Sequence, residues 1–94
     1  DPDYAYGAVS LAEARLRLAL GQPEAALAAL RRFELGSGPS PHSACLAARA
    51  LTALGRGSEA RARIAEVPAL YAALPAFRRK QERLWLWRAR FGRC

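Results

Sequence analysis

Apolar residues recur at intervals of three and four positions along most of the chain. This spacing places them on one face of an α-helix. The stripes cover residues 11–18, 26–33, 46–54 and 60–67, and a further stripe covers 77–91. The pattern therefore predicts a succession of amphipathic helices.

Glycine and serine residues mark expected helix ends. Gly21 and Gly55 each follow an apolar stripe, and glycine suits a helix end because it enters the left-handed backbone region without steric cost. Ser10, with Glu13 three residues later, is a candidate capping box for the first helix. Ser58 is a candidate N-cap for the fourth helix.

Prolines indicate where the middle helices begin. Pro23 stands where a second helix would start, at a position that needs no amide hydrogen. The stretch 36–41, rich in glycine, serine and proline, predicts a loop between two helical hairpins. A third helix is expected to begin within 41–43.

Two further prolines divide the C-terminal half. Pro68 is expected to end or kink the fourth helix. A short helical or irregular bridge over 70–74 then leads to Pro75, and the last helix is expected to run from there to about Phe91.

The composition favours helices over strands. Alanine and leucine, both strong helix formers, fill 36 of the 94 positions, and methionine is absent. β-branched residues, which favour strands, occur only four times, at Val9, Thr52, Ile64 and Val67. The expected fold class is all-α.

The sequence repeats itself at a step of 34 positions. Leu20-Gly21 recurs as Leu54-Gly55. Repeats of this length, with a turn between two helices, are typical of stacked helical hairpins, because one hairpin alone cannot bury its apolar stripe. The other recurring pairs are Ala14 and Ala48, Ala26 and Ala60, Leu30 and Ile64, Phe33 and Val67, and Pro41 and Pro75.

A 34-residue helix–turn–helix unit with glycine in the turn and alanine five residues later resembles the tetratricopeptide repeat (TPR). Gly21 and Ala26, then Gly55 and Ala60, match the turn glycine and the close-packing alanine of that family. The resemblance covers about residues 7–74. It implies a helical repeat scaffold that holds a peptide or a helix of another protein in a groove.

The domain organisation follows from this resemblance. It implies a single TPR-like domain over 1–94, with one repeat over 7–40, a second over 41–74 and a C-terminal capping helix over 75–91. Two stacked hairpins and a long last helix would form a segment of an α-α superhelix. Because the chain opens on Asp1, we expect it to be a segment of a larger protein.

Two narrower bacterial resemblances involve the middle of the chain. Pro41-His42, followed by a Leu-Ala-Ala-rich helix and a glycine turn, is similar to the repeat region of the haem-operon inner-membrane protein. The same stretch resembles the small export chaperones of type III secretion. The first resemblance implies a membrane-anchored scaffold, and the second implies a chaperone.

The formal charge of +7 is concentrated at the C-terminal end. Up to Gly55, acidic and basic residues cancel, with five of each. From Ala76 to the end, seven basic residues accompany a single acid, Glu82. Such a patch attracts an acidic protein, nucleic acid or an anionic membrane surface. A solvated helix surface is the alternative interpretation.

The last helix carries more apolar residues than one stripe can hold. Phe77, Leu84, Trp87 and Phe91 share a face and are expected to pack onto the preceding hairpin. Trp85 points elsewhere, because residues 85 and 87 lie on opposite sides of a helix. We therefore expect a second contact at Trp85, with the parent protein, a second subunit or a separate partner.

The two cysteines, Cys45 and Cys94, lie 49 positions apart and have neither disulfide-framework nor metal-ligand spacing. Cys45 is expected to be a buried free thiol in a helix, and Cys94 a mobile terminal residue. Unpaired thiols favour a reducing compartment. We therefore expect a cytoplasmic location, with no metal site and no cofactor.

The titratable residues do not suggest an active site. The single histidine, His42, has no aspartate nearby in sequence to orient its ring, since Asp1 and Asp3 are both at the N-terminus. The glutamates are spread over expected helix surfaces, without HExxH or a phosphate-binding loop. We therefore expect that the protein is not an enzyme.

The function expected from sequence is therefore a non-catalytic protein–protein interaction module, a scaffold, adaptor or chaperone. Its partner would be an acidic or amphipathic segment of another protein. Two alternatives stay open: a basic last helix that binds nucleic acid or an anionic membrane surface, and self-association through that helix. The candidate partner-binding residues are Arg17, Arg49, Thr52, Arg83, Trp85 and Arg88.

Overall fold

Five helices follow one another in the computed structural model, which describes the backbone of residues 2–92 and 94 and the side chains of residues 9–92 and 94. No strand occurs in this part of the chain, so the all-α prediction is confirmed. The helices are α1 (Pro2–Ala19), α2 (Pro23–Ser37), α3 (Pro41–Ala53), α4 (Gly57–Ala72) and α5 (Ala76–Arg90).

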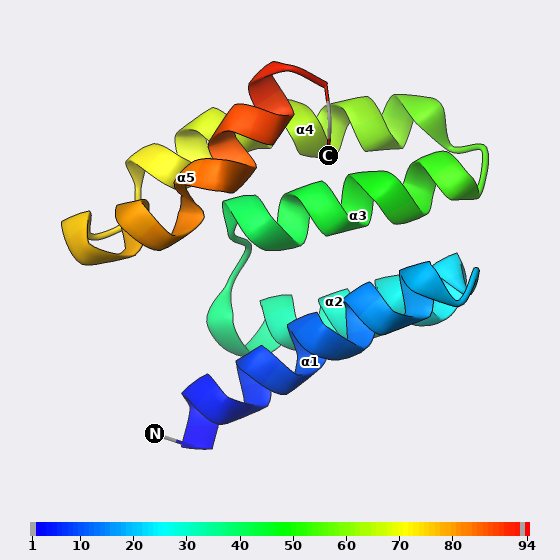
Figure 1. The fold of residues 1–94 in the computed structure, drawn as a ribbon, viewed down its shortest axis with the longest axis horizontal. Helices are drawn as coiled ribbons and strands as arrows, with labels where there is room; N and C mark the ends of the chain where they lie inside the picture. The colour runs from blue at the N-terminus through cyan, green and yellow to red at the C-terminus, as the bar shows by residue number, and fades with distance from the viewer. Residues whose placement is uncertain (1, 93) are drawn as a thin grey trace.

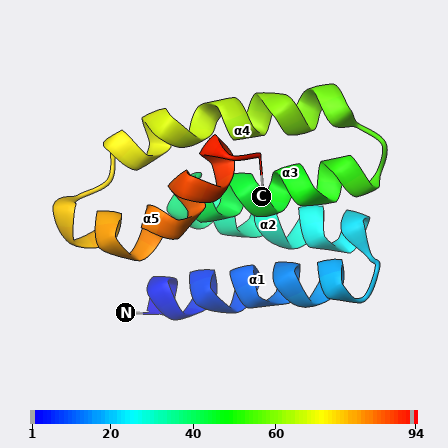
Figure 2. The ribbon, with the colours of Figure 1, turned by 45° about the horizontal axis from the view of Figure 1, so that its top comes forward.

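The helices form two stacked hairpins and one further helix. Helices α1 and α2 pair, α3 and α4 pair, and α5 packs against both α3 and α4. Figure 1 shows α1, α3 and α5 on the near side, with α2 and α4 behind them. After a turn of the molecule, Figure 2 shows α1, α2, α3 and α4 one above the other in chain order from bottom to top. This arrangement agrees with the predicted stack of hairpins followed by a long last helix.

Helix α3 is the centre of the fold, because it contacts each of the other four helices. Its sequence suits this position, since alanine side chains let neighbouring helices approach closely and lose no side-chain entropy on burial. Leu46 supplies the largest fully buried side chain of this helix. The other buried apolar side chains of α3 are those of Ala44, Cys45, Ala47, Ala48, Ala50 and Leu51.

The two turn glycines act as predicted. Gly21 and Gly55 follow α1 and α3 with φ angles of 72° and 75°, which any residue with a Cβ adopts at a steric cost. The alanines five positions later, Ala26 and Ala60, are both buried. The small side chains predicted from the 34-residue step therefore lie at helix contacts.

Two predicted N-caps are wrong. Helix α1 begins at Pro2, so Ser10 lies inside it and is buried instead of capping a helix end. Helix α4 begins at Gly57, one residue before Ser58, and its N-cap position is occupied by Arg56. The Arg56 guanidinium donates to both carboxylate oxygens of Glu59, at 2.5 and 2.9 Å, so an ion pair occupies this helix start.

The predicted breaks at proline are partly corrected. Helix α2 extends to Ser37, so the loop between the hairpins is shorter than the predicted 36–41. Pro68 lies inside α4, which continues to Ala72 and includes most of the expected bridge. Proline removes one backbone hydrogen bond but does not end a helix that is supported by tertiary packing.

A polar cluster fixes the start of α3. Ser40 and Ser43 form a capping box, in which each backbone amide donates to the other hydroxyl, at 2.9 and 3.1 Å. The Ser43 hydroxyl also donates to Glu34 Oε2 of α2 at 2.7 Å, and the same carboxylate pairs with Arg63 of α4. The cluster therefore links three helices next to the hairpin loop.

The two cysteines form a disulfide, so the prediction of unpaired thiols is wrong. Cys45 lies in α3 and Cys94 after α5, and their Cα atoms are 4.8 Å apart. The burial expected for Cys45 is observed. The sequence did not reveal the pair because α4 and α5 return the chain to α3. The argument for a reducing compartment loses its basis.

None of the described helices is both long enough and apolar enough to cross a membrane.

Candidate functional site

Helix α5 presents the opposite face from the one predicted. Trp85 faces the core and is 8% exposed, together with Glu82 and Ala89, which share its side of the helix. The stripe that was expected to face the core is instead on the surface, where its side chains can contact a binding partner. The exposed fractions are 71% for Phe77, 55% for Leu84, 49% for Trp87 and 64% for Phe91.

The orientation of α5 is set by a stack around Trp85. The indole ring lies on the imidazole of His42 in α3, with ring centroids 4.0 Å apart and planes inclined by 12°. The Arg88 guanidinium carbon lies 4.9 Å from the centroid of the same indole, a favourable cation–π distance. The Trp85 carbonyl oxygen also contacts Cys45 Sγ at 3.6 Å. These contacts explain why Trp85, not Trp87, faces inward.

His42 is therefore a packing residue in the first turn of α3. Burial, together with the positive charges of Arg15 and Arg88, lowers the pKa of His42 to about 4. Its Nε2 atom is buried and has no hydrogen-bond partner among the described residues. The ring is neutral at pH 7, which allows it to stack beside two arginines.

Glu82 was expected on the surface, but it is buried beside the same stack, at 7% exposure. Burial raises the pKa of Glu82, while the charge of Arg78 and a hydrogen bond from the His42 backbone amide act in the opposite direction. Its Oε2 atom has no partner in the described part of the chain. The carboxyl group lies at the start of α3, where helix amides favour a negative charge.

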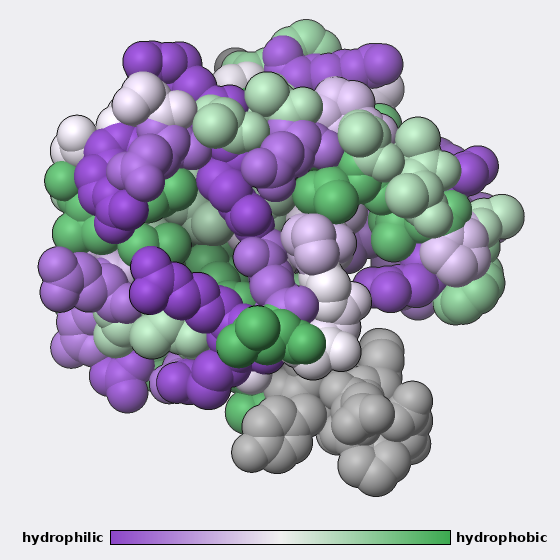
Figure 3. All heavy atoms as spheres, turned by 180° about the vertical axis from the view of Figure 1, so that it is seen from behind, coloured by the Kyte–Doolittle hydropathy of each residue, from purple (hydrophilic) through white to green (hydrophobic). Residues whose placement is uncertain are grey.

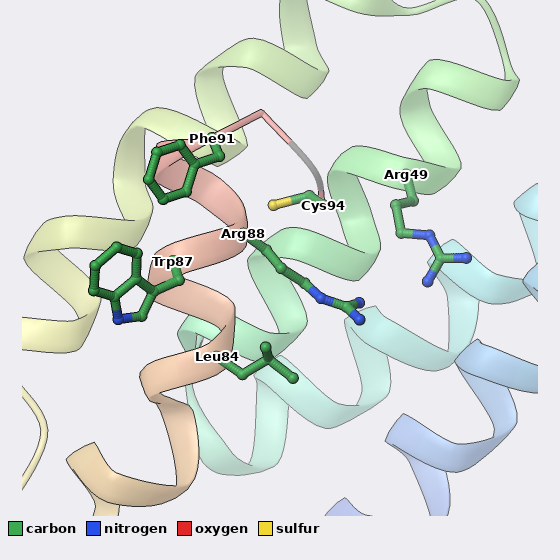
Figure 4. A pocket seen from close by; sticks show the side chains of 6 residues that line it. All are labelled: Arg49, Leu84, Trp87, Arg88, Phe91 and Cys94. Carbon is green, nitrogen blue, oxygen red and sulfur yellow. The ribbon is translucent and has the colours of Figure 1, made fainter.

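An open groove of about 830 Å³ lies between α3 and the exposed stripe of α5. Figure 4 shows Arg88 extending from α5 toward α3, with Arg49 on the facing side and Trp87 and Phe91 on the outer side. Its lining residues are Arg49, Leu84, Trp87, Arg88, Phe91 and Cys94.

The aromatic part of the groove is ordered by its own contacts. Trp87 and Phe91 stack one helical turn apart, with ring centroids at 5.6 Å and planes inclined by 16°. Leu84, Trp87 and Phe91 share one face of α5, because they are spaced by three and four residues. All three are exposed, and they line the groove together with Arg49 and Arg88.

The groove includes two of the six predicted site residues, Arg49 and Arg88. Trp85 lies beneath the surface, so the expected contact at an exposed Trp85 is wrong. The other three do not line the groove, and two of them have partners within the chain: Arg17 donates to Gln22 Oε1 at 2.8 Å, and Thr52 donates to the Ala48 carbonyl at 2.8 Å. Arg83 is exposed on α5, away from the groove.

Four residues of the groove are not among those predicted from the sequence: Leu84, Trp87, Phe91 and Cys94. The stripe was visible in the sequence, but an apolar stripe on a helix is more often core than surface. The buried face of α5 carries Glu82 beside Trp85 and Ala89, and the stacking partner of Trp85, His42, is 43 positions away in sequence. No local signal distinguishes the two faces.

The arginines of the groove differ from several arginines elsewhere on the described surface, which form ion pairs. Within residues 9–92 and 94, the ion pairs join side chains of α1, α2 and α4 and the turn before α4, and neither Arg49 nor Arg88 has a carboxylate partner. The side of the molecule opposite to Figure 1 shows hydrophilic and hydrophobic side chains interspersed (Figure 3).

The described residues contain no group of three or more histidine, cysteine, aspartate or glutamate side chains that could hold a metal ion. Comparisons of the chain with protein families, curated proteins and solved structures found no match.

Proposed function

We propose that this chain is a non-catalytic protein-binding module, built from TPR-like hairpins, whose groove between α3 and α5 holds a peptide or a helix of another protein. The observation that carries the proposal is the exposure of Leu84, Trp87 and Phe91 along the groove, with the rings of Trp87 and Phe91 stacked on each other. Contiguous apolar patches on a protein surface mark interaction sites, and tryptophan and arginine are enriched among residues that dominate binding energy.

The hairpin geometry supports the TPR-like part of the proposal. Gly21 and Gly55 have the left-handed conformation in the turns, and Ala26 and Ala60 are buried at the helix contacts. Helices α1, α3 and α5 form one layer (Figure 1), so the groove lies on the layer of first helices. Repeat scaffolds of stacked helical units bind partners on extended surfaces of this kind.

The position of the single histidine supports a non-catalytic role. His42 is half-buried against Trp85, and burial together with the charges of Arg15 and Arg88 lowers its pKa to about 4. It does not line the groove. The groove itself is lined by arginines, apolar side chains and a disulfide cysteine.

A second candidate function is favoured by one observation. Exposed aromatic rings beside unpaired arginines can stack on bases and contact phosphates, so α5 could bind single-stranded nucleic acid. An anionic membrane surface would be attracted by the same charges. Self-association through α5 is disfavoured, because it would bring two arginine-rich helices together.

The proposal is tested by selecting a displayed library of random peptides against the protein, with Trp87→Ala as the counter-selection target. Trp87 is half exposed, so this variant is expected to keep the fold. Enrichment of peptides that bind the wild type and not the variant supports a protein-binding groove. Failure to enrich any Trp87-dependent peptide, together with Trp87-dependent binding of single-stranded DNA, would overturn it in favour of the second candidate.

A further inference from the structure

We infer that the preferred occupant of the groove is an acidic amphipathic helix that lies along α5, with its apolar side chains on the exposed stripe and its carboxylates on Arg49 and Arg88. This inference rests on the proposed function and specifies the chemistry of the partner. It is argued from the spacing, the charge and the internal contacts of α5.

The spacing of the apolar residues fits a helical partner. Phe77, Leu84 and Phe91 follow one another at intervals of seven residues, and Trp87 lies beside Phe91. The stripe from 77 to 91 therefore runs along the whole of α5, for about 20 Å at the usual helical rise. A helix with apolar residues at intervals of three and four positions would contact this stripe over about four turns.

The charge on both sides of the stripe selects an acidic partner. Lys80 is exposed on α5, half-buried Arg88 lines the groove, and Arg49 of α3 lines it from the other side. The acid of α5, Glu82, is buried on the other side of the helix. The partner therefore meets cations on the exposed face, and carboxylates next to its apolar side chains would be paired on binding.

The same charges argue against a second copy of this chain as the occupant. Helix α5 holds six basic residues and one acid, so two copies joined through this stripe would bring like charges into contact. The groove also suits a peptide better than a nucleic acid. Leu84 and Phe77 add apolar surface that a phosphodiester backbone does not match, because every nucleotide carries a charge.

Arg88 has a constrained position that supports its role in recognition. Its guanidinium lies over Trp85, so part of its conformational freedom is already lost before a ligand binds. A preorganised arginine loses less entropy when it pairs with a carboxylate. Arg49, in contrast, is exposed and makes no described side-chain hydrogen bond, so it can be changed without affecting the core.

The test uses three labelled helical peptides of equal length and fluorescence anisotropy at low salt. The first has leucines at the spacing of the α5 stripe and glutamates on the flanks, the second has glutamine in place of each glutamate, and the third is a scrambled glutamate peptide. We expect the first to bind at least about tenfold more tightly than the other two, with an affinity that falls as salt increases.

Matched variants separate specific pairing from general charge attraction. Arg49→Glu reverses a charge in the groove, and Arg83→Glu makes the same change on α5 outside it. We expect Arg49→Glu to weaken the glutamate peptide about tenfold and Arg83→Glu to weaken it less than about threefold. Equal effects of the two variants would overturn the assignment of the carboxylate site.

The outcomes also distinguish this inference from the proposed function. If the glutamine peptide binds as tightly as the glutamate peptide and both need Trp87, the groove binds proteins but does not select acidic partners, and the inference fails alone. If no peptide binds in a Trp87-dependent manner and the displayed library also yields none, both fail. Preferential binding of single-stranded DNA would overturn the inference in favour of nucleic acid.

Discussion

The indole of Trp85 lies flat on the imidazole of His42, at a centroid distance of 4.0 Å, and this contact determines which face of α5 reaches solvent. With Trp85 directed inward, Trp87 two residues later must point outward. The stack joins His42 at the start of α3 to Trp85 in the last helix. It thereby sets the orientation of α5, and this orientation places Trp87 in the groove.

The two tryptophans should contribute very differently to stability. We expect Trp85→Ala to lower the free energy of unfolding by about 3 kcal/mol or more, because it removes a buried ring and leaves a cavity beneath Arg88. Trp87→Ala should lower it by less than about 1 kcal/mol, since that ring is half exposed. Urea denaturation of the two variants measures both values. Similar losses would contradict the assigned orientation of α5.

His42 should make the fold less stable in mild acid. Its pKa is about 4 in the folded protein and 6.5 in a model peptide, so between these values the unfolded chain binds the proton more readily. The stabilisation is complete above pH 6.5 and is lost as the pH falls toward 4. We expect a loss of about 1 to 2 kcal/mol between pH 7 and pH 5.

His42→Phe is the control for this pH dependence, because it keeps an aromatic ring against Trp85 and removes the titrating group. We expect the variant to lose less stability between pH 7 and pH 5 than the wild type. Denaturation curves at both pH values provide the comparison. An unchanged pH dependence in the variant would show that other groups are responsible.

Glu82 should have the opposite pH dependence. Burial raises its pKa above the ordinary value, so the folded chain holds the proton more tightly. The stabilisation from this group is present at low pH and is lost as the pH rises through the folded pKa. We therefore expect Glu82→Gln to be more stable than the wild type at pH 7, with a smaller advantage at pH 4. Thermal unfolding at the two pH values measures this, and a destabilised variant at pH 7 would contradict it.

The disulfide should stabilise the C-terminal half of the fold. Cys45 and Cys94 enclose α4 and α5 in one covalent loop. Closing such a loop lowers the conformational entropy of the unfolded chain, which stabilises the folded state by about 2 to 4 kcal/mol. We expect Cys94→Ala to lower the free energy of unfolding by that amount. Because Cys94 also lines the groove, the variant should bind the glutamate peptide more weakly.

Cys94→Ala is preferable to a change at Cys45, which is fully buried and would add a packing defect. The wild type in the presence of a dithiol reductant serves as the second comparison. Equal stability of the oxidised wild type, the reduced wild type and the variant would show that the covalent link contributes nothing.

Much of the fold could be predicted from the sequence because it is encoded locally. The helix stripes, the turn glycines at Gly21 and Gly55, and the start of α3 at Pro41 all depend on residues close to one another in the chain. The N-caps at Ser10 and Ser58 were wrong for a related reason. A serine near the expected start of an apolar stripe fits a capping motif, but tertiary packing extends α1 and places Ser10 inside it.

The site could be predicted less well because it depends on contacts between distant residues. Arg49 is predicted from its place on the first helix of a repeat, and Arg88 from its place on the basic last helix. The inward turn of Trp85 requires His42, and the disulfide requires the return of the chain to α3. Neither pairing is visible as a spacing in one sequence. As a result, the stripe of Leu84, Trp87 and Phe91 was assigned to the core.

The most direct test of this account is acrylamide quenching of tryptophan fluorescence in two single-tryptophan variants. Trp87→Phe leaves Trp85 as the only tryptophan, and Trp85→Phe leaves Trp87. We expect Trp85 to emit at shorter wavelength and to be weakly quenched, and Trp87 to be quenched several-fold more strongly, as its half-exposed ring requires. A protected Trp87 and a readily quenched Trp85 would show that the stripe is packed inside the protein, and the proposed groove would not exist.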